Sequence, residues 1–256
     1  MADPVGSDSL RLIVPDWPAP DSIAALSTTR IGGVSQAPFD ALNLGDHVDD
    51  DPRHVRANRQ LLQTALDQGV DCQWLRQVHG TEVARLSRVG AVIEADAAIT
   101  TQPGIACLVM TADCLPVLFC NRQGTRVAAA HAGWRGLADG VLESTFRALA
   151  LPANELMCWL GPAIGPQAFE VGCEVRQQFC RQQAEAEAAF VPHDRARNTW
   201  LADIYQLARL RLSQIGITAI YGGDYCTFTD AERFFSYRRD GRSGRMASLV
   251  WIRPGC

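Results

Sequence analysis

The fold is decided by residues 105–136, which read IACLVMTADCLPVLFCNRQGTRVAAAHAGWRG. This stretch holds three apolar runs separated only by short polar turns: Ile105–Thr111, Pro116–Cys120 and Arg126–Ala130. Apart from Thr111 and Arg126 at their ends, the runs are apolar and do not alternate, which is typical of strands covered on both faces. Their close spacing in the sequence is typical of strands joined as hairpins.

Outside this stretch, the same patterns predict further strands and helices. Apolar runs indicate strands at Trp74–His79, Glu82–Leu86, Leu156–Leu160, Ala219–Tyr221 and Ala247–Ile252. Apolar stripes and capping residues indicate helices at Asp51–Gly69, Leu137–Leu149, Val171–Ala188 and Leu201–Gln214, with a short one at the Thr229/Glu232 capping box. Some strands are spaced as hairpins and others are separated by helices. This mixture predicts an α+β fold with mixed sheets, in one domain over residues 1–256.

The composition excludes several classes of partner. The chain has 256 residues, 47% of them hydrophobic, and a net charge of -4, so neither nucleic acid nor an anionic membrane surface is an expected partner. No apolar run approaches the roughly 20 residues that span a bilayer. The N-terminal residues carry no apolar signal core, so we expect a cytoplasmic protein. The oligomeric state is left open.

Lysine is absent, and all 24 basic residues are arginines. Schiff-base chemistry, pyridoxal phosphate catalysis and phosphate loops ending in Gly-Lys-Ser/Thr are therefore excluded. Any phosphate must be bound by arginine, backbone N–H groups or a metal. The nine cysteines are expected to be reduced thiols, because their number is odd and several lie in apolar runs.

Three segments place a soft metal ligand at the end of a predicted strand, next to small residues. They carry His79, Cys114 and His131. Imidazole and thiolate ligands suit zinc, and three protein ligands leave one position open for water or substrate. The spacings match no compact zinc finger, so structural histidines remain an alternative at this point.

Other polar features are open to two interpretations. Arg238, next to Arg239, is either an anion clamp or a solvated corner. Arg30 lies in a polar, glycine-containing loop that either contacts an anion or forms a surface turn. Asn43 is either a buried turn residue or a substrate contact, and Asp113 either orients a ligand or caps a turn.

Several motifs in one order resemble the laccase-domain or polyphenol oxidase family, whose members are now mostly described as purine nucleoside phosphorylases. They run through nearly the whole chain: Thr28-Thr29-Arg30, Leu42-Asn43-Leu44-Gly45, Asn58-Arg59, Gln77-Val78-His79-Gly80, Ala95-Asp96-Ala97, Thr111-Ala112-Asp113-Cys114, His131-Ala132-Gly133-Trp134-Arg135-Gly136, Gly161-Pro162-Ala163-Ile164-Gly165 and Phe234-Phe235-Ser236-Tyr237-Arg238-Arg239. The metal-binding positions show no departure from the family pattern.

The resemblance implies a fold, a site and an activity. The fold is a four-layer α/β/β/α arrangement, similar to the catalytic domains of cytotoxic necrotising factor toxins. His79, Cys114 and His131 would be the metal ligands, and Asn43 and Arg59 would line the substrate pocket. The implied activity is phosphorolysis of adenosine, inosine and methylthioadenosine, with adenosine deamination as a side activity. Bacterial relatives have also been linked to peptidoglycan precursor editing.

The older laccase name can be tested on residue types. A blue multicopper oxidase needs around ten histidines, mostly in His-x-His pairs, whereas this chain has five and no such pair. Two histidines and a cysteine would hold one Cu²⁺ in place of Zn²⁺. We therefore expect, at most, weak polyphenol oxidation beside the main reaction.

Three functions remain open from the sequence. In the first, zinc at the three ligands serves phosphorolysis or deamination, an arginine (Arg30, Arg59 or Arg238) binds phosphate, and Asp113 or Glu170 moves protons. In the second, Cys114 is a nucleophile and His131 its base in a thiol hydrolase or deamidase. In the third, the protein binds purines without turnover. His79 favours the metal, because a Cys–His dyad gives it no role.

Overall fold

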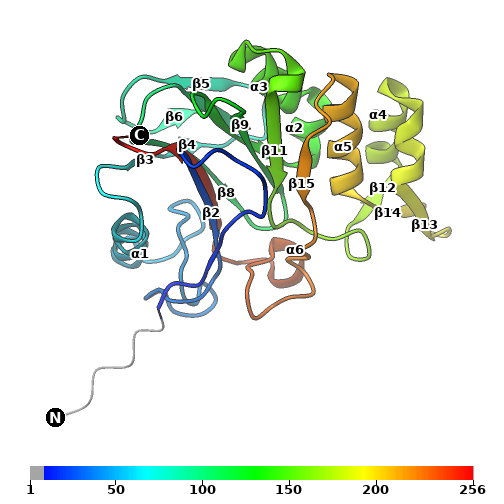
Figure 1. The fold of residues 1–256 in the computed structure, drawn as a ribbon. Helices are drawn as coiled ribbons and strands as arrows, with labels where there is room; N and C mark the ends of the chain where they lie inside the picture. The colour runs from blue at the N-terminus through cyan, green and yellow to red at the C-terminus, as the bar shows by residue number, and fades with distance from the viewer. Residues whose placement is uncertain (1–8, 256) are drawn as a thin grey trace.

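The computed structural model describes residues 9–255. Two mixed β-sheets pack face to face, and helices cover the outer face of each sheet (Figure 1). The α+β class and the four-layer order are as the sequence and the resemblance imply. The expectation about the N-terminal segment falls, apart from Ser9, outside the described residues. No helix of this described part has both the length and the apolar surface needed to cross a bilayer.

The first sheet contains five strands and carries α1 (Pro52–Thr64) on its outer face. Its order is β1 (Leu12–Ile13), β2 (Ile23–Thr28), β16 (Met246–Ile252), β8 (Ile105–Thr111) and β3 (Asp71–Gln73). All neighbours are antiparallel except β8 and β3. Helix α1 begins where the Asp51 side chain accepts a hydrogen bond from the Arg53 backbone N–H, as its Asp-Pro start predicts. Its Leu62 packs against Leu108 and Leu249 of the sheet.

The second sheet holds the last two runs of residues 105–136 as the hairpin of β9 (Leu115–Asn121) and β10 (Val127–Ala132), whereas the first run, Ile105–Thr111, is β8 of the other sheet. The order of the second sheet is β15 (Ile220–Gly222), β11 (Leu156–Leu160), β9, β10, β7 (Ala97–Thr100) and β5 (Val83–Leu86). The central pairs are antiparallel, and the two edge strands are parallel to their neighbours. Buried side chains such as Val109 and Leu118 fill the space between the sheets.

Helices α2 (Trp134–Asp139), α3 (Val141–Leu149) and α5 (Ile204–Gln214) cover the second sheet. The single predicted helix over Leu137–Leu149 is wrong in one respect. Gly140 adopts a left-handed conformation with φ of 98° and divides it into α2 and α3. Glycine tolerates this conformation at little steric cost.

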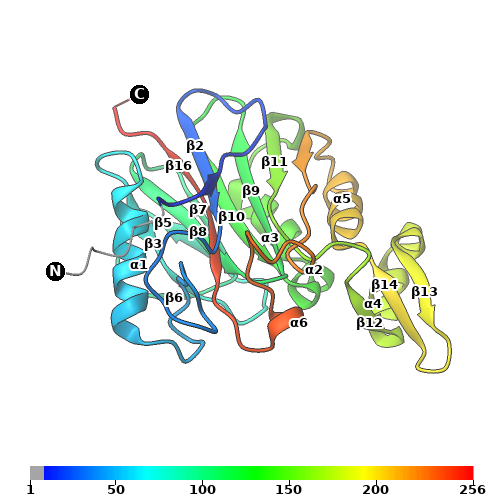
Figure 2. The ribbon, with the colours of Figure 1, turned by 90° about the horizontal axis from the view of Figure 1, so that it is seen from below.

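A smaller sheet lies at one end of the molecule, next to α4 (Cys173–Gln182), as Figure 2 shows. It pairs β12 (Glu170–Gly172), β14 (Thr199–Ala202) and β13 (Phe190–Asp194). The helix predicted over residues 171–188 is therefore wrong at both ends. Its start pairs with β14, and an extended Gln183 separates α4 from the 3₁₀ helix η2 (Ala184–Ala189).

Short elements complete the fold and correct two further predictions. They are β4 (Leu75–Arg76) paired with β6 (Ile93–Glu94), the 3₁₀ helix η1 (Ala153–Glu155) and α6 (Tyr237–Asp240). The predicted strand Trp74–His79 is shortened to Leu75–Arg76, and the positive φ of His79, 62°, excludes that residue from a ladder. The Thr229 capping box opens only turns, and the helix of this region is capped instead by Ser236.

Candidate metal centre

His79, Cys114 and His131 come together at one end of the two sheets. Cys114 lies where the chain leaves β8 of the first sheet and enters β9 of the second. His131 stands on the neighbouring strand β10, opposite Pro116. His79 comes from the loop after β4. The three ligands thus depend on the packing of the two sheets.

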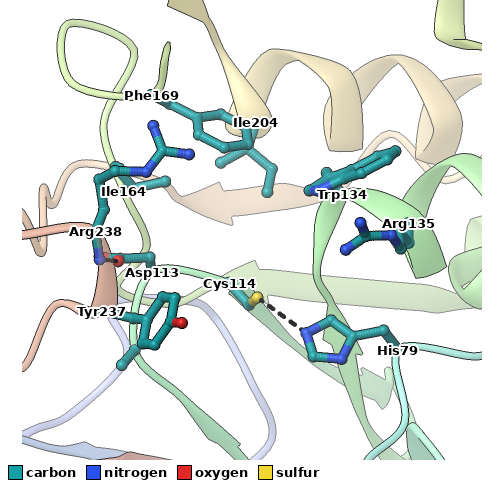
Figure 3. Close-up of a pocket in the computed structure, with 11 residues that line it drawn as sticks. His79, Asp113, Cys114, Trp134, Arg135, Ile164, Phe169, Ile204, Tyr237 and Arg238 are labelled. Atoms are coloured by element: carbon teal, nitrogen blue, oxygen red, sulfur yellow. Dashed lines mark hydrogen bonds between the residues drawn. The ribbon is translucent and has the colours of Figure 1, made fainter. Parts of the chain in front are cut away.

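The geometry of the three side chains suits one metal ion. One ligand atom from each of the three lies within 4.8 Å of the other two. His79 Nε2 is 3.8 Å from Cys114 Sγ (Figure 3), and the two imidazole ring centres are 4.8 Å apart. His131 is 3% exposed, whereas His79 is exposed and Cys114 is half-buried. The cluster is therefore anchored on a buried side and open on the other.

A buried carboxylate, Asp96, organises two of the three ligands. Its Oδ1 lies 2.8 Å from His131 Nδ1, which leaves Nε2 of that ring to face the cluster. Its two oxygens also accept the backbone N–H groups of Val78, His79 and Gly80. Partners of this kind fix the ring orientation of metal-binding histidines. The sequence marks Asp96 only as part of a motif; its signal is a lone carboxylate between two buried alanines.

Charge in the cluster is arranged for metal binding. Burial alone would raise the pKa of the Cys114 thiol, but His131 and His79 outweigh it and lower the pKa to about 6. Burial alone would lower the pKa of His131, but Cys114 and Asp96 raise it to about 9. Thiolate is the form of cysteine that binds metals, and His131 must release its proton when it becomes a ligand.

The residue after β10, Gly133, brings its backbone against the cluster. A Cβ at this position would lie 2.9 Å from His79 Cδ2 and 3.0 Å from Cys114 Sγ. One turn later, a Cβ on Gly136 would lie 2.9 Å from the carbonyl oxygen of Gly80. The small residues around the histidines therefore let α2 pack directly on the loop that carries His79.

An aromatic cavity of about 250 Å³ opens on one side of the cluster. Figure 3 shows it between Cys114 and His79 below and the rings of Phe169 and Trp134 above. Its lining also includes Ile164, Ile204, Tyr237, Asp113, Arg135 and Arg238. A cavity with flat apolar walls and a few polar groups is typical of sites for small planar ligands.

A second, polar cavity of about 450 Å³ opens on the same cluster. It shares His79, Ala112, Cys114, Arg135 and Tyr237 with the aromatic cavity. Its remaining lining is His131, Met110, Thr111, Gln77, His47 and Arg245. The candidate metal centre therefore lies at the junction of the two cavities.

Of the four residues expected to bind substrate, Arg30, Asn43, Arg59 and Arg238, only Arg238 lines either of these cavities. Its guanidinium donates to the carbonyl oxygen of Glu170 and lies 5.7 Å from the ring centre of Phe169. Arg30 lies in a separate hollow and bonds to the side chain and backbone of Asp40. Arg59 donates to Leu44, pairs with Asp46 and stacks at 3.8 Å on Trp74.

Asn43 is fully buried beneath the polar cavity and does not line it. Its amide nitrogen donates to Gly45 and Asp50, and its oxygen accepts the backbone N–H groups of Gly45 and Arg245. These four bonds satisfy the amide within the protein. The structure thus gives Asn43 the means to position Arg245, which the sequence did not single out.

The two candidate proton carriers have internal partners. The carboxylate of Asp113 accepts the hydroxyls of Thr227 and Ser236 and the backbone N–H of Arg238. It therefore ties three distant segments together at the cavity wall. Glu170 lies on β12 beside His193 and Arg197, outside the lining of both cavities.

Comparison with known proteins places this chain in a family. Residues 24–253 match the family model described as multi-copper polyphenol oxidoreductase laccase. A purine nucleoside phosphorylase of Pseudomonas aeruginosa is 59% identical over 94% of this chain and 98% of its own. The purine nucleoside phosphorylase YfiH of Escherichia coli is 56% identical over 94% of this chain and 99% of its own.

Solved structures agree with this placement. The crystal structure of a Neisseria meningitidis protein matches with a TM-score of 0.90 and 50% identity, over 94% of this chain and 99% of its own. YlmD from Geobacillus stearothermophilus matches with a TM-score of 0.84 and 29% identity, over 91% of this chain and 93% of its own. The family match and these identities extend over nearly the whole chain, so the protein belongs to the multi-copper polyphenol oxidoreductase laccase family, in which its curated relatives are named purine nucleoside phosphorylases.

Proposed function

We propose that this protein is a zinc-dependent purine nucleoside phosphorylase that acts on adenosine, inosine and methylthioadenosine. The names of its relatives support the reaction class. The observation that carries the proposal is the aromatic cavity beside the three-ligand cluster. Phe169 and Trp134 offer rings to a purine base, and base–aromatic stacking contributes about 1–3 kcal/mol per base where it has been measured. One catalytic domain over the chain is part of the same proposal.

The donor set of the cluster fits a zinc ion. It combines two imidazole nitrogens with a cysteine sulfur of lowered pKa, and a buried carboxylate orients one of the imidazoles. Three protein ligands would leave one position on the metal for water or substrate, and His79 and Cys114 line both cavities. When bound, the metal would supply Lewis acidity at this point. The same ligands would accept Cu²⁺, so weak polyphenol oxidation stays part of the proposal.

In phosphorolysis, a phosphate oxygen forms a bond to C1′ of the ribose while the bond from C1′ to N9 of the purine breaks. The purine leaves with the electron pair and takes up a proton. The chain's own residues would hold the base between Phe169 and Trp134 and exclude water there. Arg135 and Tyr237, which line both cavities, would lie along the ribose and the incoming phosphate.

The test uses metal-loaded protein, inosine and inorganic phosphate. We expect hypoxanthine and ribose 1-phosphate in equal amounts, and we expect both to vanish with Cys114→Ser. A matched control is Cys173→Ser, which changes a cysteine outside both cavities. Absence of ribose 1-phosphate above background, from protein shown to hold metal, would overturn the phosphorylase proposal.

Adenosine deamination as a side activity needs a proton carrier at the purine. Asp113 has both oxygens occupied by internal hydrogen bonds, and Glu170 stands outside the cavity lining. Deamination is therefore expected to be slow relative to phosphorolysis. Inosine formation from adenosine in phosphate-free buffer measures it directly. A cytoplasmic location also fits the proposal, because all eight described cysteines are free thiols.

A second candidate function rests on the pairing of Cys114 with His131. A thiol of lowered pKa beside a histidine that a carboxylate orients is also the arrangement of a thiol hydrolase or deamidase. The implied likeness to necrotising factor toxins and the link to peptidoglycan precursors belong to this candidate. Activity that survives chelation but is lost on alkylation of Cys114 would support it. Loss on chelation and recovery with zinc would support the phosphorylase.

A further inference from the structure

The polar cavity has an unusual balance of charge. Besides the candidate ligands His79 and His131, its lining carries Arg135, Arg245 and a further histidine, His47, and none of its lining residues is acidic. The aromatic cavity, by contrast, has Asp113 in its wall. A hollow lined by cationic side chains without carboxylates concentrates anions.

Arg245 is the best-placed cation in this cavity. Its guanidinium donates through one nitrogen to the carbonyl oxygens of Ser243 and Gly244. No carboxylate pairs with it among residues 9–255. Burial lowers its pKa, which means that the folded protein holds this charge at a cost that an anion would offset. The Asn43 oxygen fixes its backbone N–H at 2.9 Å.

Arg135 and His47 face the same space. Within the described part of the chain, Arg135 has neither an ion pair nor a side-chain hydrogen bond, and its guanidinium lies 4.4 Å from the ring centre of Trp134. Burial and then Arg245 lower the pKa of His47, which keeps its ring neutral and able to donate a hydrogen bond. Gln77 and Thr111 add polar groups to the wall.

We propose that this polar cavity is the subsite for the phosphate co-substrate, with Arg245 as its anchor and Arg135 and His47 as further donors. The proposal rests on the phosphorylase function. It replaces Arg30 and Arg59 as phosphate ligands, because both already have partners elsewhere. Base and phosphate then approach from different cavities and meet at the cluster of His79, Cys114 and His131. Planar guanidinium groups bind phosphate through paired N–H donors.

The first experiment compares Arg245→Gln with Arg245→Lys and with the exposed Arg242→Gln as control. We expect the KM for phosphate to rise about 10-fold or more in Arg245→Gln, less in Arg245→Lys, and not at all in the control. The KM for inosine should change less than about 2-fold. An unchanged phosphate KM in folded Arg245→Gln would overturn the subsite.

The second experiment measures binding of inorganic phosphate by isothermal titration calorimetry to metal-free and to metal-loaded protein. We expect binding in the wild type that weakens about 10-fold or more in Arg245→Gln. His47→Asn should also weaken phosphate binding. Because this substitution alters an exposed side chain, it provides the test if Arg245→Gln does not fold. If phosphate binds and its affinity depends on Arg245, but no ribose 1-phosphate forms, the anion subsite is supported and the phosphorylase proposal is wrong. If the enzyme turns over but neither substitution changes its affinity for phosphate, the subsite proposal is wrong and the phosphorylase proposal stands.

Discussion

Asp96 Oδ1 lies 2.8 Å from His131 Nδ1, and the Asp96 carboxylate is fully buried. Burial alone would raise the pKa of Asp96, but the bonds from His131 and the backbone N–H groups of the His79 loop lower it. The carboxylate is therefore held ionised where it aligns two of the three ligands. This one side chain connects the buried strand β10 to the exposed loop of His79.

Asp96→Asn should weaken zinc binding about 10- to 100-fold, the range found when such partners of ligating histidines are changed. The asparagine amide replaces one accepting oxygen with a donating nitrogen, so it cannot accept hydrogen bonds from His131 and three backbone N–H groups together. The measurement is competition with a chromophoric chelator. Glu94→Gln, two residues away and exposed, should bind zinc as the wild type does. Wild-type affinity in folded Asp96→Asn would contradict the role given to this carboxylate.

Gly133→Ala should lower zinc affinity while the metal-free fold is retained. The backbone of Gly133 has φ of -60°, which alanine adopts freely, so the new methyl group acts only through its contacts. It would push His79 and Cys114 apart, and His79 is exposed and can move. Chelator competition and thermal melting of the metal-free protein separate the two effects. Gly90→Ala, with open space around its Cβ, is the control. Equal zinc affinity of both variants would count against the close packing.

Cys114 should react with iodoacetamide well below the pH at which ordinary thiols do. A lowered pKa means that the thiolate persists as the pH falls until it is protonated near pH 6, whereas an unshifted thiol loses its charge near pH 9. We expect the alkylation rate in metal-free protein, followed by mass spectrometry of the Cys114 peptide, to fall by half near pH 6. His131→Gln should move that midpoint upward. A wild-type midpoint near pH 9 would refute the thiolate–imidazolium pair.

Phe169→Leu should lower kcat/KM for inosine about 3- to 10-fold, because leucine keeps most of the apolar volume but removes the ring that faces the base. Some loss of stability is expected as well, since Phe169 is buried in the core. Phe190→Leu is the matched control, because it is equally buried in the same core but lies outside both cavities. Both variants should melt at a lower temperature, and only Phe169→Leu should change kcat/KM. Equal kcat/KM in the two would remove Phe169 from the proposed base site.

Part of this molecule could be predicted from local sequence. The strands Ile105–Thr111 and Leu156–Leu160 have the predicted bounds, because an apolar run in water must be covered on both faces wherever it lies. Thiolate and imidazole beside small residues form a local pattern that marks the candidate metal ligands, but this pattern also fits structural histidines, and the resemblance to the family favoured the metal. Local signals gave wrong predictions at two places. At Gly140 a left-handed residue divides the predicted helix, and at the Thr229 capping box only turns follow.

The sequence by itself determined the α+β class, the covered strands and the residue types able to hold a metal or bind phosphate. Only the tertiary structure decided which of these residues meet. Asp96 reaches His131 across 35 positions, and Asn43 holds Arg245 across 202. Such pairings depend on two sheets packing with a definite register, and spacing along the chain carries no record of that. For this reason the arginine that best suits phosphate emerged only once the fold placed it beside Cys114 and His79.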